Sequence, residues 1–512
     1  MIKLTILRAA LAATALSFAV SPVLAGKSDD TLNWSTTREI DVALPYYNNT
    51  RELVIIGRHA WDNLLYRDTK TFEYKPLLAK SYKWVDNVTM DFVLRDDVKF
   101  HNGQPMTADD VVATYNHVVS DGSGVLTKNN VSWMKNAEKT GKYSLRLHLK
   151  KPFPAALEFL SGPLAIFPAN IWATAKKDAA GKPDYATVAP IGTGPYKITK
   201  TTPGVGVTME INNNYMSGSP KGKPTINKIV FRTVSDPEAQ LAELLTGSLD
   251  WIWDISKDKA TDLKAMGGTT VVNAPTMRIS YIAMDRADRA KGTPFANAKV
   301  RQAVAHAIDR EAISRELVGG SSKVIHSACF PTQFGCTDEV PKYDYNPAKA
   351  KKLMAEAGYP DGFKTEILAY RQREFTEAVI GYLKKIGISA GLKYQQYKSA
   401  RGLVWEGKAP FHQMTWGSYS VNDASAITSH FFKHGKDDYC RDDDVKNWLD
   451  IADTSTDPAI RKTNYAKALV RIQENLCWLP MFTYTKNYGF NKGLDFTATA
   501  DEIPRFFNAK WK

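Results

Sequence analysis

The chain has 512 residues, with 67 Lys and Arg against 54 Asp and Glu and a formal charge of +13. A hydrophobic fraction of 44% and a charged fraction of 24% are ordinary for globular proteins, so composition excludes disordered, collagen-like and coiled-coil chains. The one long apolar stretch lies at the N-terminus, which excludes a polytopic membrane protein.

The N-terminal residues 1–25 have the three parts of a secretory signal. Lys3 and Arg8 form a basic start, an apolar run covers 9–20, and Ala25 ends a small-residue cleavage site. The apolar run is too short to span a bilayer comfortably, which argues against an uncleaved anchor. The residue directly after the cleavage site is Gly26 and not a Cys, so we expect an exported, soluble protein without a lipid anchor.

Helices and strands alternate irregularly along the rest of the chain, which predicts a mixed α/β protein. Residues 90–94 and 143–149 alternate apolar and polar side chains and are predicted strands of a β-rich region. Between them, Thr107 and Asp110 resemble a capping box at a helix start. A further strand is predicted at 229–231.

Three later helices have clear boundary signals. Asp236-Pro237 offers an N-cap and a first-turn proline, and Gly247 can end that helix. Asn346-Pro347 repeats this arrangement, with Gly358 as the end. Apolar residues at helical spacing predict another helix before Gly387.

Four cysteines allow three disulfide pairings in an exported chain. We prefer Cys329 with Cys336 and Cys440 with Cys477. Zinc is the alternative, but no Cys-x-x-Cys is present and no His adjoins either pair, so no metal site is expected.

Catalytic and cofactor motifs are absent from the sequence. It contains no Gly-x-Ser-x-Gly, His-Glu-x-x-His, phosphate loop or dinucleotide fingerprint. His430 and His434 share a helical spacing but have no carboxylate pattern that demands a metal. Basic and acidic residues are interleaved, which argues against nucleic acid as a partner despite the positive charge.

Several segments together resemble the extracellular solute-binding proteins of ABC importers, in the large peptide/nickel class called family 5. The matching strings include LAKSY at 78–82, VKFHNG at 98–103, MTADDVV at 106–112, GTGPY at 192–196, VRQA at 300–303 and AIDR at 307–310. They continue through YNP at 345–347 and AGY at 357–359, in the family order over nearly the whole mature chain.

The resemblance implies an α/β, two-lobed periplasmic-binding-protein fold with an additional β-rich subdomain in the first lobe. After the signal peptide at 1–25, we expect the first lobe at 26–280, including the subdomain at about 56–190. The second lobe is expected at 281–483, and 484–512 returns to the first lobe. The implied function is that of a periplasmic, monomeric carrier, not an enzyme, which delivers its ligand to a membrane permease and its ATPase. No cofactor is implied.

Two residues of the second lobe match pocket positions of dipeptide-binding members. Arg371 matches an Arg that grips a ligand carboxylate, and its planar fork suits that group. Arg373 is the alternative in a shifted register, and a surface Arg or a structural ion pair is the other interpretation. Trp416 matches an aromatic pocket residue, with core packing as the alternative.

The loop after Trp416 departs from the dipeptide pattern. Tyr419 stands where dipeptide binders have an Asp that pairs with the ligand ammonium. Asp423 could serve if the loop shifts. Otherwise an amine-modified conjugate of the opine type fits better, with Ser418, Tyr419 and Asn422 as hydroxyl partners.

We therefore expect a carrier of small peptides or peptide-like amino-acid conjugates. A nickel or haem carrier of the same class is one alternative, although the pocket segments lack a clear His cluster. An exported hydrolase is the alternative from another class, and recovery of an intact ligand would distinguish it from a carrier.

Overall fold

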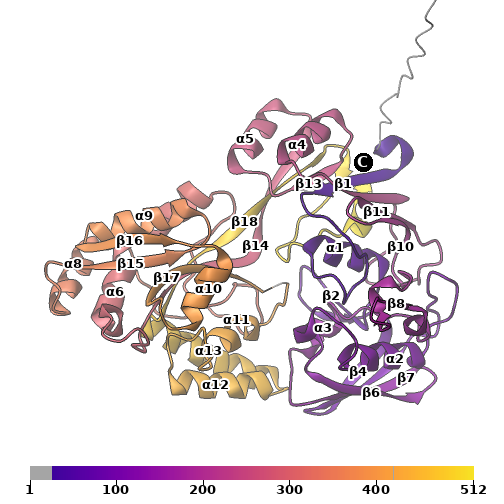
Figure 1. Ribbon diagram of the computed structural model, residues 1–512, viewed down its shortest axis with the longest axis horizontal. Helices are drawn as coiled ribbons and strands as arrows, with labels where there is room; N and C mark the ends of the chain where they lie inside the picture. Colours follow the sequence, from indigo (N-terminus) through magenta and orange to yellow (C-terminus); the bar gives the residue numbers. More distant parts are fainter. Residues whose placement is uncertain (1–25, 419) are drawn as a thin grey trace, which may run out of the picture.

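The computed structural model describes residues 26–418 and 420–512, so the expected signal peptide and Tyr419 lie outside the described residues. Figure 1 shows two bodies joined by two long strands, β14 (Thr269–Met284) and β18 (Trp478–Asn491). We call 26–280 with 484–512 the first lobe and 281–483 the second lobe. These boundaries stay a prediction, and both fall inside the joining strands.

One ten-stranded sheet runs through both lobes, in the order β10-β11-β12-β1-β13-β18-β14-β17-β15-β16. Its first-lobe strands are β1 (Thr31–Thr36), β10 (Tyr196–Thr202), β11 (Gly206–Ile211), β12 (Lys228–Thr233) and β13 (Trp251–Trp253). Its second-lobe strands are β15 (Phe363–Ala369), β16 (Ile388–Tyr394) and β17 (Phe411–Gly417). The strands β14 and β18 lie between the two groups and pair antiparallel with each other.

The joining strands change their surroundings halfway along. The pairing of β14 with β18 is regular from Thr269 to Pro275 and then shifts register before Ile279. On either side of that shift, Ala274 packs into the first-lobe core and Met277 into a second-lobe core. Because register and core change at the same place, this is where the lobes can hinge.

The predicted β-rich region forms a four-stranded antiparallel sheet in the order β4-β5-β7-β6. Its strands are β4 (Ala79–Asp86), β5 (Thr89–Leu94), β6 (Met134–Gly141) and β7 (Ser144–Leu149). Helix α2 (Ala108–Val119) packs on it, and the Thr107–Asp110 capping box is present. Alternate side chains of β7 are buried, as the sequence pattern predicts.

The remaining first-lobe elements surround these sheets. The helices are α1 (Arg51–Ala60), α3 (Ala156–Leu160), α4 (Pro237–Thr246) and α5 (Lys257–Met266). Short two-stranded pairs are β2 (Leu65–Arg67) with β3 (Tyr74–Pro76), β8 (Lys176–Lys177) with β9 (Pro183–Asp184), and β19 (Leu494–Asp495) with β20 (Lys510–Trp511). The predicted caps of α4 are confirmed: Asp236 accepts from the Glu238 N–H, and Gly247 has the left-handed φ of 78° that ends the helix.

Helices cover the second-lobe part of the sheet (Figure 1). They are α6 (Ala298–Ala307), α7 (Arg310–Ala312), α8 (Pro347–Glu356), α9 (Arg373–Lys384), α10 (Tyr397–Trp405), α11 (Ser425–Phe431), α12 (Asp443–Thr454) and α13 (Pro458–Asn475). Asn346 caps α8, as predicted, and α9 ends before Gly387. Within 26–418 and 420–512, no helix combines the length and the apolar character needed to cross a bilayer.

Both preferred disulfides are confirmed, since Cys329 bonds Cys336 and Cys440 bonds Cys477. Both lie in the second lobe, where Cys329, Cys440 and Cys477 are part of one apolar core. The Cys440–Cys477 bond ties the loop before α12 to the start of β18.

Candidate functional site

A cavity of about 1090 Å³ lies between the lobes and takes its walls from both. Helix α1 and the α3 segment line it from the first lobe, while β17 and the loop after β15 line it from the second. Of the residues predicted from the sequence, Arg371, Trp416 and Ser418 line this cavity together. The volume is enough for a ligand larger than a single amino acid.

The other predicted residues are placed differently. The Asp423 carboxylate is 2% exposed and forms an ion pair of 2.8 Å with Arg461, so its charge is already neutralised inside the second lobe. Asn422 is also buried, and its backbone N–H, not its side chain, reaches across to Glu158. Neither side chain lines the cavity, and Tyr419 lies outside the described residues. The idea that Asp423 shifts to meet a ligand ammonium therefore has no support in this geometry.

Arg371 follows the end of β15 and is exposed toward the cavity. Its guanidinium carbon lies 6.0 Å from the ring centre of Tyr484. Among the described residues it has no carboxylate partner and no hydrogen bond, so its donors are available to a ligand. Burial raises the pKa of Tyr484, and the nearby charges of Arg371 and Arg278 act in the opposite direction.

Arg278 reaches the same region from β14, just before the expected lobe boundary at 280. Because it pairs with β17 of the second lobe, we count it with the second-lobe wall. It pairs with Gly417 of β17, and a Cβ at Gly417 would lie 2.9 Å from Arg278 Nη2, so this position leaves room for the Arg side chain. Arg278 Nη1 donates to Thr415 Oγ1 at 3.1 Å. No described carboxylate forms an ion pair with Arg278. Together with Arg371, it gives the second-lobe wall two positive charges without an ion-pair partner among the described residues.

Trp416 supplies an aromatic surface beside these cations. Its ring stacks on His430 at 4.8 Å and meets Phe431 edge-on at 5.1 Å, so one side packs into the lobe. The residue is only half-buried and lines the cavity, and its Nε1–H has no partner in the described part of the chain. The two interpretations from sequence, core packing and pocket lining, therefore both apply.

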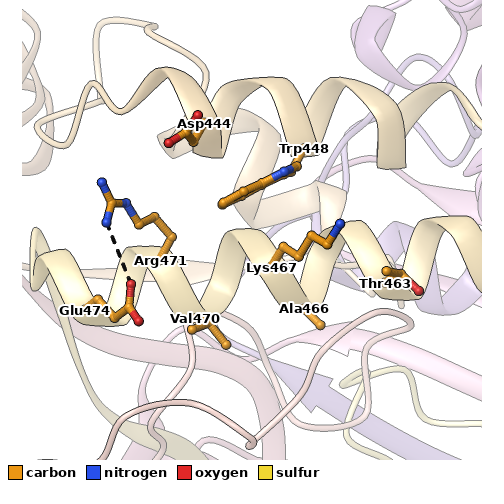
Figure 2. A pocket seen from close by; sticks show the side chains of 8 residues that line it. All are labelled: Asp444, Trp448, Thr463, Ala466, Lys467, Val470, Arg471 and Glu474. Carbon is orange, nitrogen blue, oxygen red and sulfur yellow. Dashed lines mark ion pairs between the residues drawn. The ribbon is translucent and has the colours of Figure 1, made fainter.

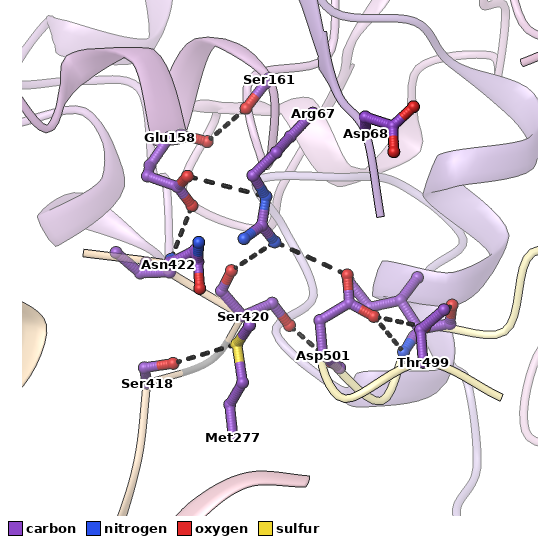
Figure 3. Close-up of polar contacts among 12 residues, drawn as sticks. Arg67, Asp68, Glu158, Ser161, Met277, Ser418, Ser420, Asn422, Thr499 and Asp501 are labelled. Carbon is purple, nitrogen blue, oxygen red and sulfur yellow. Dashed lines mark hydrogen bonds and ion pairs between the residues drawn. The ribbon is translucent and has the colours of Figure 1, made fainter. Parts of the chain in front are cut away.

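The first-lobe wall is built from paired charges (Figure 3). Arg505 pairs with Asp501 at 2.6 Å, and Arg67 lies 3.6 Å from both Asp501 and Glu158. Burial raises the pKa of Glu158, although the Arg67 charge and the Asn422 N–H oppose that rise. Burial acts in the same direction on Asp501, but the charge and hydrogen bond of Arg505, together with Arg67 and Thr499, outweigh it and hold the pKa of Asp501 well below its usual range.

A loop of the second lobe lies against this wall. Arg67 Nη2 donates to the Ser420 carbonyl at 2.9 Å, and Arg51 Nη1 donates to Ser420 Oγ at 2.9 Å. Ser420 Oγ in turn donates to the Asp501 carbonyl at 2.7 Å. The Asn422 N–H donates to Glu158 Oε2 at 2.7 Å. These bonds join the lobes in the conformation described here (Figure 3).

A second buried ion pair forms part of this wall. Lys221 Nζ is 2.6 Å from Asp62 Oδ1, with side-chain exposures of 3% and 0%. The same ammonium donates to the backbone carbonyls of Arg58 and Trp61. Lys221 therefore ties the end of α1 to a loop that lies about 160 residues later in the chain.

Positive charge dominates the cavity lining. Five lining residues are acidic: Glu52, Glu158, Asp254, Asp501 and Glu502. Ten are basic: Arg38, Arg51, Arg58, Arg67, Lys128, Lys221, Arg278, Arg371, Lys486 and Arg505. Such an excess raises the local concentration of anions and favours a negatively charged ligand.

Two other kinds of site have less support. An open groove of about 710 Å³ lies between α12 and α13, and Trp448 and Val470 are among its lining residues, but it involves one lobe alone (Figure 2). In the described part of the chain, no group of three or more His, Cys, Asp or Glu side chains could hold a metal ion.

Sequence reasoning missed much of this site. Arg278 had a usable signal, because it interrupts an apolar strand segment that includes Met277, Ile279 and Ile282. The first-lobe residues Arg58 and Arg67 had none, because their role depends on which charges the fold brings beside them.

Comparison with known protein families and proteins identifies the family of this chain and several of its relatives. The model of the family described as bacterial extracellular solute-binding proteins, family 5 Middle, matches residues 73–439. The oligopeptide-binding protein AppA of Bacillus subtilis (strain 168) is 30% identical over 307 residues, which are 59% of this chain and 55% of that protein. Heme-binding protein A of Haemophilus influenzae is 27% identical over 363 residues, 66% of this chain and 64% of that protein. The matched part is thus less than two thirds of either relative.

A third relative, the glutathione-binding protein GsiB of Salmonella paratyphi A, is 27% identical over 384 residues, 73% of this chain and 71% of that protein. Among solved structures, HbpA2 from Haemophilus parasuis has a TM-score of 0.82 at 24% identity, covering 94% of this chain and 100% of that chain. AgaA in complex with agropinic acid, from A. tumefaciens R10, has a TM-score of 0.70 at 24% identity, covering 94% of this chain and 99% of that chain. The fold is therefore the mixed α/β fold of periplasmic binding proteins, with an extra antiparallel sheet.

Proposed function

This chain belongs to the bacterial extracellular solute-binding proteins of family 5, a family of binding proteins and not of enzymes, and on that premise we propose that it captures a small anionic peptide or peptide-like conjugate in the periplasm for an ABC importer. The observation that carries this proposal is the pair Arg278 and Arg371. Both line the cavity between the lobes, and neither has a carboxylate partner among the described residues.

A ligand carboxylate is the group that these two side chains suit best. The guanidinium fork matches the two oxygens of a carboxylate, and charge-assisted hydrogen bonds of this kind are stronger than neutral ones. The half-buried ring of Trp416 offers an apolar surface next to that charge, with its Nε1–H as a further donor. Ser418 adds a hydroxyl at the cavity edge, where its Oγ contacts Met277 Sδ at 3.8 Å.

The ligand class follows from the size of the cavity and from its charges. A volume of about 1090 Å³ exceeds what a dipeptide needs and suits a longer peptide or a conjugate. The relatives are named for oligopeptides, haem and glutathione, and one similar structure holds agropinic acid. Tyr419 stands where dipeptide binders have an ammonium-pairing Asp, and Asp423 is engaged by Arg461. An amine-modified conjugate of the opine type therefore remains the favoured ligand.

Capture works through lobe closure. Each lobe supplies one wall of the cavity, so a ligand contacts both walls only when the lobes are together. The hydrogen bonds from Arg51 and Arg67 to Ser420 stabilise the closed state without any contribution from the ligand. The closed, loaded protein then docks on a membrane permease that is coupled to an ATPase.

The first experiment identifies the ligand. Native mass spectrometry of protein purified from periplasm gives the mass of what co-purifies. Calorimetry then compares dipeptides, longer peptides, glutathione, haemin and opine-type conjugates. We expect Arg371→Ala to weaken binding of the best solute by about 2–5 kcal/mol, because its carboxylate loses a fork-shaped partner.

The matched control is Arg373→Ala. Arg373 lies two residues further on, pairs with Glu377 on the surface of α9, and does not line the cavity. It should bind as the parent does. If Arg371→Ala also binds as the parent does, the carboxylate assignment is wrong, and if free-amine dipeptides bind better than every conjugate, the inference from Tyr419 fails.

A further inference from the structure

The first-lobe wall carries donors that the protein itself leaves unused. Arg58 is half-buried and lines the cavity, where Nη1 donates to Asn63 Oδ1 and to the Ser161 carbonyl, both at the long distance of 3.3 Å. Among the described residues it forms no ion pair. Beside it, Asn63 is 4% exposed and lines the cavity, and its Nδ2 has no hydrogen-bond partner.

A third donor lies next to these two. Arg67 has a side-chain exposure of 10%; its Nε faces Glu158 and its Nη2 donates to the Ser420 carbonyl, whereas Nη1 has no partner in the described part of the chain. Arg58 and Arg67 both contact the segment around α3, one through Ser161 and the other through Glu158, and the Arg67 charge acts on Arg58. The unused donors of Arg58, Asn63 and Arg67 therefore belong to one patch.

The chemistry of this patch is one-sided, because the unused atoms are all donors. A buried donor without an acceptor costs free energy, so the arrangement calls for a group rich in acceptors. Burial and the neighbouring Arg505 charge lower the pKa of Arg58 to about 9, and the charges of Asp501 and Glu158 offset this lowering only in part. The C-terminal end of α1 attracts the Arg58 charge, but it offers nothing to Asn63 Nδ2.

We propose that Arg58, Asn63 and Arg67 form a second anion subsite, which holds a carboxylate or phosphate group of the solute on the first-lobe wall. The solute then carries at least two anionic groups, one for this subsite and one for Arg278 and Arg371 on the opposite lobe. This inference rests on the proposed function, since it adds a second charge to the same ligand. It also explains why binding closes the lobes, because a dianion joins a positive patch on each.

The main experiment uses matched probes that differ by one charge. The probes are glutathione and its glycine amide, and Ala-Ala-Glu with Ala-Ala-Gln, each titrated into the parent, Arg58→Gln and Arg58→Lys. We expect the acidic member of a pair to bind about 10- to 100-fold more tightly to the parent, the range of one charge-assisted hydrogen-bonded group. Arg58→Gln should remove that preference, and Arg58→Lys should restore part of it.

The results separate this proposal from the proposed function. Equal binding of both members of every pair to the parent overturns the subsite, as does an Arg58→Gln that weakens both members equally. In either case Arg371→Ala can still abolish binding, and the proposed function then stands without the second charge.

A probe that needs no knowledge of the solute covers the case in which no peptide binds. At equal ionic strength, the parent should have a higher thermal midpoint in sulfate than in chloride. The same difference between the two salts should be smaller for Arg58→Gln. Absence of a sulfate effect in the parent, together with no binding in the panel, overturns the subsite. A sulfate effect that depends on Arg58 supports the subsite even if the proposed solutes fail.

Folding is the last control. If Arg58 were structural, Arg58→Gln would lower the thermal midpoint of the ligand-free protein as much as Arg505→Gln, which breaks the Asp501 pair. We expect Arg58→Gln to leave the midpoint unchanged or to raise it, because it removes a repulsive charge from beside Arg505.

Discussion

The two walls of the cavity differ in how their charges are satisfied. On the first-lobe wall, Lys221 pairs with Asp62, Arg505 with Asp501, and Arg67 lies between Asp501 and Glu158. On the second-lobe wall, Arg278 and Arg371 have no such partner within the described residues. The first wall is completed by folding, whereas the second depends on a ligand for its counter-charge.

This difference assigns different tasks to similar side chains. A buried pair that is complete before binding holds the shape of its wall, and removal of one partner leaves an unpaired charge in a dry environment. An unpaired cation at a cavity surface contributes little to folding but gives its full interaction to the ligand. The Arg58 patch is the exception on the first wall, since it resembles the second wall in its unused donors.

The two lobes also differ in their disulfide bonds. Both disulfides lie in the second lobe, and the chain contains no other cysteine. The first lobe relies on buried ion pairs, while the second adds cross-links. The comparison therefore predicts that stability and binding respond to different substitutions in the two lobes.

The largest expected effect on stability comes from breaking the Lys221–Asp62 ion pair. Lys221→Met should lower the free energy of unfolding of the ligand-free protein by about 3–5 kcal/mol, because Asp62 is left buried and unpaired. Urea denaturation followed by circular dichroism measures this change. The control is Lys139→Met in the same lobe, whose pair with Asp109 is exposed at 43% and 57% and should contribute about 0–1 kcal/mol. Equal effects of the two substitutions would contradict the structural role of the buried pair.

The next effect concerns the second-lobe disulfides. Replacing Cys440 and Cys477 together by Ser should cost on the order of 3–4 kcal/mol, because the bond closes a separation of 37 residues. The Cys329–Cys336 bond closes only 7 residues and should contribute about 2 kcal/mol in the same chain-entropy treatment. Denaturant midpoints of the two double variants test this order. A larger loss from the short loop would show that native-state packing, not chain entropy, dominates.

The sequence predicted those parts of the fold that depend on near neighbours. The caps of α4 at Asp236 and Gly247 and the alternation in β7 follow from spacing within a few residues. Disulfide pairing could be chosen because only three arrangements exist. Arg371 and Trp416 came from the family resemblance, since nothing local distinguishes them from surface or core residues.

The rest required contacts between distant segments. Asp423 seemed available for a ligand because its partner Arg461 lies 38 residues later in the chain. The unused donors of Arg58 and Asn63 become visible only when every neighbouring acceptor has been located. Whether a charged residue is free or paired is a property of the whole fold, so charge alone could not identify the patch.

A smaller effect should appear as pH dependence, through one buried histidine in each lobe. Burial lowers the pKa of His412 to about 4 and that of His59 to about 3. The unfolded chain then binds a proton before the folded protein does, so stability is lost as pH falls from about 6.5 toward these values. His412→Gln should reduce the loss between pH 7 and pH 4 by up to about 3 kcal/mol. Urea titrations at both pH values measure it for His412→Gln and for the matching variant His59→Gln. A parent-like pH dependence in both variants would exclude these two residues as the cause.

The smallest expected effect on stability comes from substitutions in the second-lobe wall, measured on the ligand-free protein. Arg278→Gln and Arg371→Gln should each change the free energy of unfolding of the ligand-free protein by no more than about 0.5 kcal/mol, the usual range for side chains outside buried networks. Arg371 has no hydrogen bond to another described residue, and Arg278 has one, to Thr415. Denaturation of protein freed of co-purified solute measures the change, with Arg505→Gln as the comparison from the first wall.

With the solute present, the same two variants should lose most of the ligand-induced rise in thermal midpoint. If either Arg variant unfolds as easily as Arg505→Gln without ligand, its charge is already used by the fold, and the distinction between the walls fails at that residue.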